Sequence, residues 1–585
     1  MHSEDIDYGD NMKAKLFGTA LLLSCISLMA GCGAQSLGGT EGTESISEST
    51  AEGNVAADTA DTAEQEGASD VLNSDLNADL TSTDIQLQLS FTRDSFKPFL
   101  GYDLDWLFGN DSESPEISIY KDDKGRTVIE NASYIMIYNP LVYTENNSKY
   151  LFSGNFGSQI VTKNQSEDQS AALEEVYGNR TQEVIQPVDA GSFAANTKKP
   201  GTTGAAEKNE DISHYVGEKY DFYVYNADWT DINKTSFECI YEGEYCYMWT
   251  DDGLVDRNKV KELTEAFDED VYRADVEAFG TARFMENGGK LNILFHSAPN
   301  NVYGYFNQAD LYSSSDLLPL SPDDYMMNVD QAIIHINPVT LEASMLITKS
   351  TIAHEFQHLI CFTDYVEYAQ NNTCDLWANE MMSGYAESLV YPFSEQLLYR
   401  PSDYYSSKRT RNGQSLYNFE YDNTDIGCYG TVYLYAKFFK KLSDGEGPLK
   451  FHQYWRDSRG KDISVAEAFY HSLTPEYFEL INNVEYSSEL ESMIGNKYDV
   501  FMSKMTLTYY MCTVDRTSCL ELGLLGGFNS MLLYNSESPA KIEGGGRIIV
   551  AVKDGKYIIP KDADSHLIYM IFDDKFNMLE TYEQY

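Results

Sequence analysis

Residues 350–360 read STIAHEFQHLI and contain the pattern H-E-x-x-H within an apolar sequence. In an α-helix, residues four apart lie one turn apart on the same face, so His354 and His358 can direct two imidazole nitrogens at one metal ion. Glu355 lies beside the first histidine, where a carboxylate can reach a metal-activated water without binding the metal itself. The pattern therefore predicts a helix over about 340–362 that carries two zinc ligands and a general base.

A third ligand is expected in the stretch WANEMMSGYAE, residues 377–387. We predict a second helix over about 377–390 that folds back across the first and presents the carboxylate of Glu380 to the same ion. Two histidines and one glutamate leave the fourth zinc position open, as catalytic zinc sites require. Nearby acidic residues remain alternative ligands, namely Asp364, Glu387 and Glu367, the last of which falls in a predicted loop.

Ser383 and Glu387 follow Glu380 by three and seven residues, so the three share one helical face. Either side chain can hydrogen-bond the back of a ligand histidine and fix its orientation. The alternative interpretation is a polar stripe that faces solvent.

The 585 residues exceed what one ordinary core accommodates, and 42% of them are hydrophobic. Strand-like alternation and helical periodicity occur along the same sequence, which predicts the α+β class with β-rich flanking regions. Predicted strands cover 85–89, 133–138, 220–225, 245–249, 291–295, 332–336, 548–552 and 566–571. Further predicted helices cover 260–278 and 430–442, and a helix begins near 495.

The N-terminal residues 1–32 are typical of a bacterial export signal. A positive region with Lys13 and Lys15 precedes an apolar stretch, 16–29, that is short for a membrane span. It ends in LMAGC, which resembles the lipobox of bacterial lipoproteins, so we expect lipid modification at Cys32 and a location on the bacterial cell surface. An ordinary cleaved signal is the alternative, and Met12 is a second candidate start.

Three regions flank the metal-binding pattern. Residues 33–84 lack aromatic residues and are rich in small and acidic ones, which predicts a disordered acidic tether. Residues 85–212 are predicted to form an accessory or propeptide-like region that contains a second linker. The metallopeptidase domain is expected over 213–475, and 476–585 is expected to be helical and then β-stranded.

The composition argues against nucleic acid as a partner. Asp and Glu total 92 against 42 Lys and Arg, a formal charge of -50, and phosphate binding needs clustered Lys and Arg.

Two pairs among the nine cysteines have spacings that suit disulfides within hairpins, namely Cys239 with Cys246 and Cys512 with Cys519. We expect a monomer that acts on a protein or peptide substrate.

The N-E-x-x-S pattern after H-E-x-x-H is similar to the thermolysin-like gluzincins. More closely, residues 354–360, 377–380 and 384–387 resemble the hyicolysin-type family of secreted bacterial metallopeptidases. Shorter matching segments extend the resemblance over about 213–445, and they are Phe267-Asp268, Phe279-Gly280, Gly304 to Phe306 with Asp310, Ile333 to Asn337, and Tyr429-Gly430. The sequence has Gly384 where the thermolysin pattern has an acidic residue, so Glu387 is expected to take over that residue's hydrogen bond.

This resemblance implies a zincin-like fold, with a mixed sheet over the active-site helix and a helical lower half. It implies a zinc endopeptidase in which Glu355 is the general base and Tyr429 donates to the oxyanion. We expect the strand Ile333–Ile336 to form the sheet edge that pairs with substrate, and His335 on it to be structural. Two alternatives remain: an inactive zincin-fold surface adhesin, and an enzyme that acts on another amide- or glycan-decorated substrate.

Overall fold

The structure is a computed structural model. It describes residues 115–142, 154–155 and 213–584, with gaps at 227–230, 252–254, 287, 299–301, 312–327, 329–330, 369–374, 393–394, 420–424, 459–460, 462, 515–531 and 535–540. The predicted export signal, Cys32, the tether, the strand 85–89 and the second linker lie outside these residues. None of the described helices is long and apolar enough to cross a membrane.

A six-stranded mixed sheet packs on the helix that carries H-E-x-x-H. Its strands follow the order β5-β6-β7-β8-β10-β9, with β7, β8 and β10 parallel to one another and the remaining neighbours antiparallel. The bounds are β5 Lys219–Tyr225, β6 Ile232–Glu242, β7 Cys246–Thr250, β8 Leu291–Phe295, β9 Gly304–Phe306 and β10 Ile333–Ile336. The expectation that Ile333–Ile336 forms the edge is wrong, because β10 lies between β8 and β9 and the short strand β9 takes the edge position.

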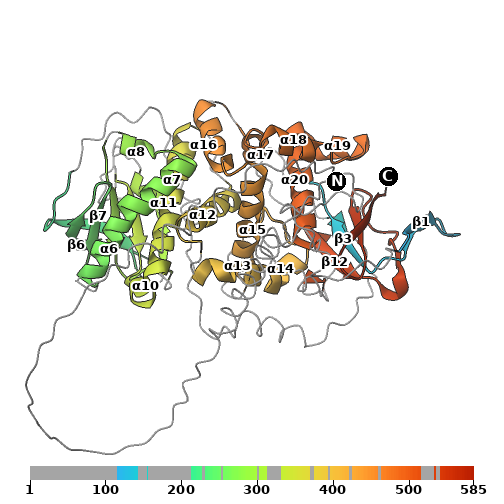
Figure 1. The fold of residues 1–585 in the computed structure, drawn as a ribbon, viewed down its shortest axis with the longest axis horizontal. Coiled ribbons are helices and arrows are strands. Elements are labelled where there is room, and N and C mark those ends of the chain that lie inside the picture. Colours follow the sequence, from blue (N-terminus) through green and yellow to red (C-terminus); the bar gives the residue numbers. More distant parts are fainter. Residues whose placement is uncertain are drawn as a thin grey trace, which may run out of the picture. The chain divides into compact units, whose positions relative to one another are not determined.

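The predicted helix over 260–278 is a continuous helical run with a π-helical turn inside it. α6 (Arg257–Ala266) passes into η2 (Phe267–Val271) and then α7 (Tyr272–Phe279). A π-turn brings residues five apart onto one face. The rings of Phe267 and Tyr272 accordingly both approach Phe356, with centroids 5.3 Å and 6.1 Å away. The run therefore packs on the helix that carries H-E-x-x-H (Figure 1).

The helix predicted over 340–362 is two helices, α10 (Pro338–Ala343) and α11 (Met345–Tyr368). Asn337 caps α10 by accepting from the backbone N–H of Val339 at 3.2 Å, and Pro338 occupies its first turn. Ser344 is extended, with φ -163° and ψ 128°, which separates the two helices. Glu367 lies within α11 and not in a loop as predicted.

Three further helices pack on α11 or on one another. α12 (Leu376–Val390) packs on α11, as predicted. α13 (Glu395–Ser406), which was not predicted, packs on α15 (Gly427–Leu442), which was predicted as a helix over 430–442. Gly430 permits the close crossing of α13 and α15. A β-carbon on Gly430 would lie 2.5 Å from both the carbonyl oxygen of Arg400 and the backbone nitrogen of Tyr404.

The remaining elements complete an α+β architecture, so the predicted class is confirmed. The short helices are α8 Arg283–Glu286, η4 Gln308–Leu311, α14 Lys408–Arg411 and η6 Lys553–Gly555. The C-terminal helices are α16 Gly447–Asp457, α17 Val465–Tyr470, α18 Pro475–Asn482, α19 Ser488–Ile494 and α20 Lys497–Val514. The outer strands are β1 Ser118–Lys121, β2 Thr127–Glu130, β3 Tyr134–Tyr138, β4 Gly154–Asn155, β11 Lys541–Ile542, β12 Arg547–Ala551, β13 Lys556–Ile558, β14 Ile568–Phe572 and β15 Met578–Glu583.

Strands from the two flanking regions share sheets. β3 pairs antiparallel with both β12 and β14, and β2 pairs with β13, so residues before 213 and after 475 form common β-structure. Buried residues of these strands, among them Ile135, Val550 and Tyr569, pack in one hydrophobic cluster. The domain boundaries themselves remain predictions.

The predicted disulfide between Cys239 and Cys246 does not form. Both thiols are free and buried, because Cys239 lies opposite Trp249 in the β6–β7 ladder, while Cys246 pairs with Leu291 of β8. Cys519, the predicted partner of Cys512, lies outside the described residues, so this pairing stays a prediction.

Candidate metal centre

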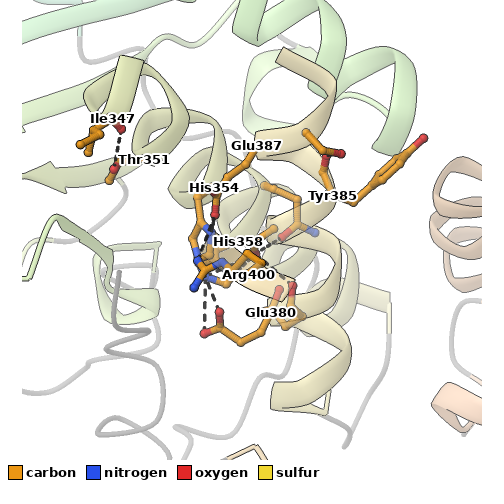
Figure 2. Close-up of polar contacts among 12 residues, drawn as sticks. Ile347, Thr351, His354, His358, Glu380, Tyr385, Glu387 and Arg400 are labelled. Carbon is orange, nitrogen blue, oxygen red and sulfur yellow. Dashed lines mark hydrogen bonds and ion pairs between the residues drawn. The ribbon is translucent and has the colours of Figure 1, made fainter. Parts of the chain in front are cut away.

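Helices α11 and α12 bring His354, His358 and Glu380 together in the interior (Figure 2). His354 Nε2 is 3.5 Å from Glu380 Oε2, and His358 Nε2 is 3.9 Å from Glu380 Oε1. One nitrogen or oxygen atom from each of the three residues lies within 4.8 Å of the other two, and all three side chains are buried. Of the alternative ligands, Asp364 and Glu367 have side chains outside the described part.

This group fits a zinc ion. Bonds of about 2.0–2.2 Å in a tetrahedron place ligand atoms roughly 3.3–3.6 Å apart, close to the separations found here. His354 Nε2 and both carboxylate oxygens of Glu380 are buried without a hydrogen bond from the described residues. Since buried polar atoms normally have partners, a shared cation would satisfy all three atoms. Two histidines and a carboxylate are also the donor set of a catalytic zinc site.

Both histidines are held from behind, as predicted. Glu387 Oε1 accepts from His354 Nδ1 at 2.8 Å. Ser383 Oγ donates to Gln357 Oε1 at 2.7 Å, and it therefore accepts from His358 Nδ1 at 2.9 Å. The contact with Glu387 leaves His354 Nε2 directed at Glu380, which is the orientation that a metal ligand needs. His358 Nε2 lies 3.9 Å from Glu380 Oε1 and 3.4 Å from Ser383 Oγ. The predicted hydrogen bonds of Ser383 and Glu387 are thus confirmed, and the alternative of a solvated stripe is wrong because both side chains are buried.

The centre is electrostatically suited to a cation. Burial acts to lower the pKa of His354, but the carboxylates of Glu380 and Glu387 outweigh it and raise that pKa to about 10. Burial lowers the pKa of His358 to about 4, and the charge of His354 adds to that effect. The buried carboxylates therefore favour a positive charge at this position. A bound metal ion would supply that positive charge.

Glu355 is fully buried on α11 beside His354. Its negative charge is among the causes that raise the pKa of His354, so the carboxylate lies within electrostatic reach of the metal-binding group. The assignment of Glu355 as general base remains a prediction.

Tyr429 is buried in the first turn of α15. Its ring packs edge-on against Phe419, with centroids 5.0 Å apart, and the guanidinium of Arg400 lies 4.6 Å above its centre. Arg400 Nη2 in turn is 3.8 Å from Glu387 Oε1. The Tyr429 ring is therefore connected to the metal centre through Arg400, and its role as oxyanion donor remains a prediction.

Asp275 and Arg400 are buried charged residues that the sequence analysis missed. Asp275 on α7 is fully buried, and burial raises the pKa of its carboxyl well above the usual range, against the opposing charge of His354. Helical spacing in the sequence could have shown that both residues lie on buried faces. Asp275 follows Phe267 and Val271 at four-residue intervals, and Arg400 lies three residues after the buried Leu397.

His335 belongs to a separate buried network on the sheet, in line with its expected structural role. Its Nε2 is 3.2 Å from Asp310 Oδ2, and its Nδ1 is 3.0 Å from His296 Nε2. Burial raises the pKa of Asp310 well above its usual range and lowers that of His335 to about 3. The hydrogen bonds therefore run in one direction, from protonated Asp310 to His335 to His296.

Comparison with known proteins gives a consistent picture. No protein-family model matches this chain. The chain is similar to the protein named "Neutral metalloprotease ShpI" from Staphylococcus hyicus, with 23% identity over 319 residues, covering 52% of this chain and 70% of that protein. That relative is named as a metalloprotease, and this chain places two histidines and a glutamate in a buried group that can hold a metal ion.

Proposed function

We propose that this chain is a zinc-dependent endopeptidase of the gluzincin type, with a zincin-like domain over 213–475 that resembles the hyicolysin-type family. The observation that carries the proposal is the buried group of His354, His358 and Glu380, with Glu355 next to the first histidine. Similarity to a metalloprotease supports the same class at a coarser level.

We propose the following role for each residue. When bound, zinc would supply Lewis-acid activation of a water molecule and of the scissile carbonyl. Glu355 accepts the proton of that water and delivers it to the leaving amine. Tyr429 donates a hydrogen bond to the carbonyl oxygen as negative charge develops there.

An extended peptide substrate is proposed to pair with β9. Among the described residues this strand is the last of the sheet, and a strand in that position offers backbone groups for strand addition. β9 also lies close to α11, since a β-carbon on Gly304 would be 2.8 Å from Cγ2 of Thr351, which precedes His354 by three residues. The geometry therefore favours peptide backbone running beside the metal centre.

We further propose that the enzyme is exported and held by lipid at Cys32 on the bacterial cell surface. The proposal rests on the apolar stretch 16–29, the LMAGC motif that follows it, and the polar composition of 33–84. A protein substrate outside the cell follows from this location.

The alternative is a surface adhesin that retains the fold without catalysis. Metal analysis and a cleavage assay on purified protein separate the two. We expect about one zinc ion per chain by mass spectrometry, casein cleavage, loss of cleavage with 1,10-phenanthroline and recovery on adding zinc. Bound zinc without cleavage of casein or a peptide library would favour the adhesin, and absence of both would refute the metal centre.

A further inference from the structure

Arg400 of α13 is a buried cation next to the metal centre. Its side chain is 2% exposed, and its Nη2 is 3.8 Å from Glu387 Oε1. The same oxygen of Glu387 accepts the hydrogen bond from His354 Nδ1. Glu387 therefore connects Arg400 to His354, a proposed metal ligand (Figure 2).

The guanidinium of Arg400 also lies over the ring of Tyr429. Its central carbon lies 4.6 Å from the centre of the ring, within the range of a cation–π contact. The backbone of Arg400 is fixed at the same place, because Gly430 brings α15 within van der Waals contact of the Arg400 carbonyl. One side chain therefore contacts both Glu387, behind the metal ligand, and Tyr429, the proposed oxyanion donor.

Charge balance gives a reason for a cation at this position. A guanidinium remains charged in proteins, and burying it is strongly unfavourable unless opposite charges lie nearby. Asp403 is also buried and lies 3.9 Å from Arg400 Nη1. Glu387 and Asp403 therefore place negative charge beside the guanidinium at both of its terminal nitrogens.

We propose that Arg400 is a positioning residue with two separable actions, and this inference rests on the proposed function. Its charge holds Glu387 against His354 and so supports metal binding. Its planar guanidinium holds the Tyr429 ring at the start of α15 and so supports turnover.

Two substitutions separate these actions. Arg400→Gln removes the charge and the stacking, so we expect zinc affinity to fall about 10- to 100-fold, as for other partners of ligand histidines, together with kcat. Arg400→Lys keeps the charge but lacks the planar fork. It should bind zinc within about threefold of wild type, while kcat remains reduced and KM unchanged. Zinc affinity is measured by chelator competition, which needs no activity.

Arg547 provides the matched control. It is also buried, its guanidinium faces the rings of Tyr404 and Tyr510 at 5.7 Å and 5.4 Å, and its Nη2 donates to the Tyr404 hydroxyl at 2.7 Å. Arg547→Gln should lower the Tm without changing zinc affinity.

The outcomes are distinct. Wild type that binds zinc and cleaves peptide, with Arg400→Gln matching it in affinity and kcat, overturns this inference alone. The inference about Arg400 is also overturned if Arg400→Gln and Arg547→Gln lower zinc affinity equally for the same loss of Tm. It is overturned as well if zinc affinity in Arg400→Lys is as low as in Arg400→Gln. Wild type that neither binds zinc nor cleaves overturns the proposed function, and this inference with it.

Discussion

Glu387 accepts a hydrogen bond from Nδ1 of His354 across 2.8 Å, and this contact leaves Nε2 of the same ring directed at Glu380, 3.5 Å away. Glu387 lies on α12 two turns after Glu380, so one helix supplies both the proposed metal ligand and the carboxylate that orients His354.

Glu387→Gln tests this contact directly. The amide keeps the size of the side chain but loses the charge that holds His354, so the zinc Kd should rise about 10- to 100-fold. Chelator competition on purified protein measures it. Glu265→Gln is the control, since Glu265 on α6 has a side chain that is 63% exposed. Equal Kd values for wild type and Glu387→Gln would remove Glu387 from the metal centre.

Tyr429→Phe separates the hydroxyl from the ring. The ring contacts with Arg400 and Phe419 persist, so stability and zinc affinity should remain close to wild type. If the hydroxyl stabilises the oxyanion, kcat should fall about 10²-fold or more with little change in KM. Steady-state cleavage of a fluorogenic peptide measures both, and an unchanged kcat would assign the oxyanion to another donor.

Gly430→Ala should destabilise the packing of α13 on α15. The new methyl would lie 2.5 Å from backbone atoms of Arg400 and Tyr404, so α13 and α15 must separate, at a cost of about 1–3 kcal/mol. Gly384→Ala is the matched control, because its methyl would meet only the side chain of Tyr433 at 3.7 Å. Alanine there should be neutral or stabilising through helix propensity. Equal Tm values for the two variants would contradict the close crossing.

Asp310→Asn should stabilise the protein as the pH rises. Burial raises the folded-state pKa of Asp310. Its stability contribution is therefore complete below the unfolded pKa of about 3.9 and is lost as pH rises toward the folded value, at up to about 1.4 kcal/mol per pH unit. Asparagine accepts from Asn328 and donates to His335 without titrating.

The Tm advantage of Asp310→Asn over wild type should consequently be larger at pH 8 than at pH 5. Thermal melts at the two pH values measure the difference. An advantage that is equal at both values, or that is larger at pH 5, would indicate that the Asp310–His335 pair does not retain a proton in the folded protein.

The sequence predicted much of the local structure, because helical and strand periodicity depend on neighbours alone. It placed the helices of His354 and Glu380. The shared face of Ser383 and Glu387 allowed hydrogen bonds to the histidines but also a polar stripe facing solvent, and only the packing of α12 on α11 decides between the two. The order of the strands in the sheet could not be predicted from the sequence patterns. The edge position of β9 depends on a pairing between residues that the pattern at Ile333–Ile336 does not contain.

Arg400 and Asp275 illustrate what sequence patterns left out. A charged residue on an apolar helical face is ambiguous until the packing partners are known. The break at Ser344 was missed for a similar reason, since apolar residues occur on both sides of it and only its extended backbone separates α10 from α11.

The most direct test of the central claim compares peptide cleavage by zinc-loaded wild type and zinc-loaded Glu355→Gln. This substitution leaves His354, His358 and Glu380 in place, so both proteins should bind zinc equally. We expect wild type to cleave a quenched peptide library at least about 10²-fold faster than the variant, as loss of a general base requires. Equal rates in the two proteins, or no cleavage by wild type with zinc bound, would contradict the account.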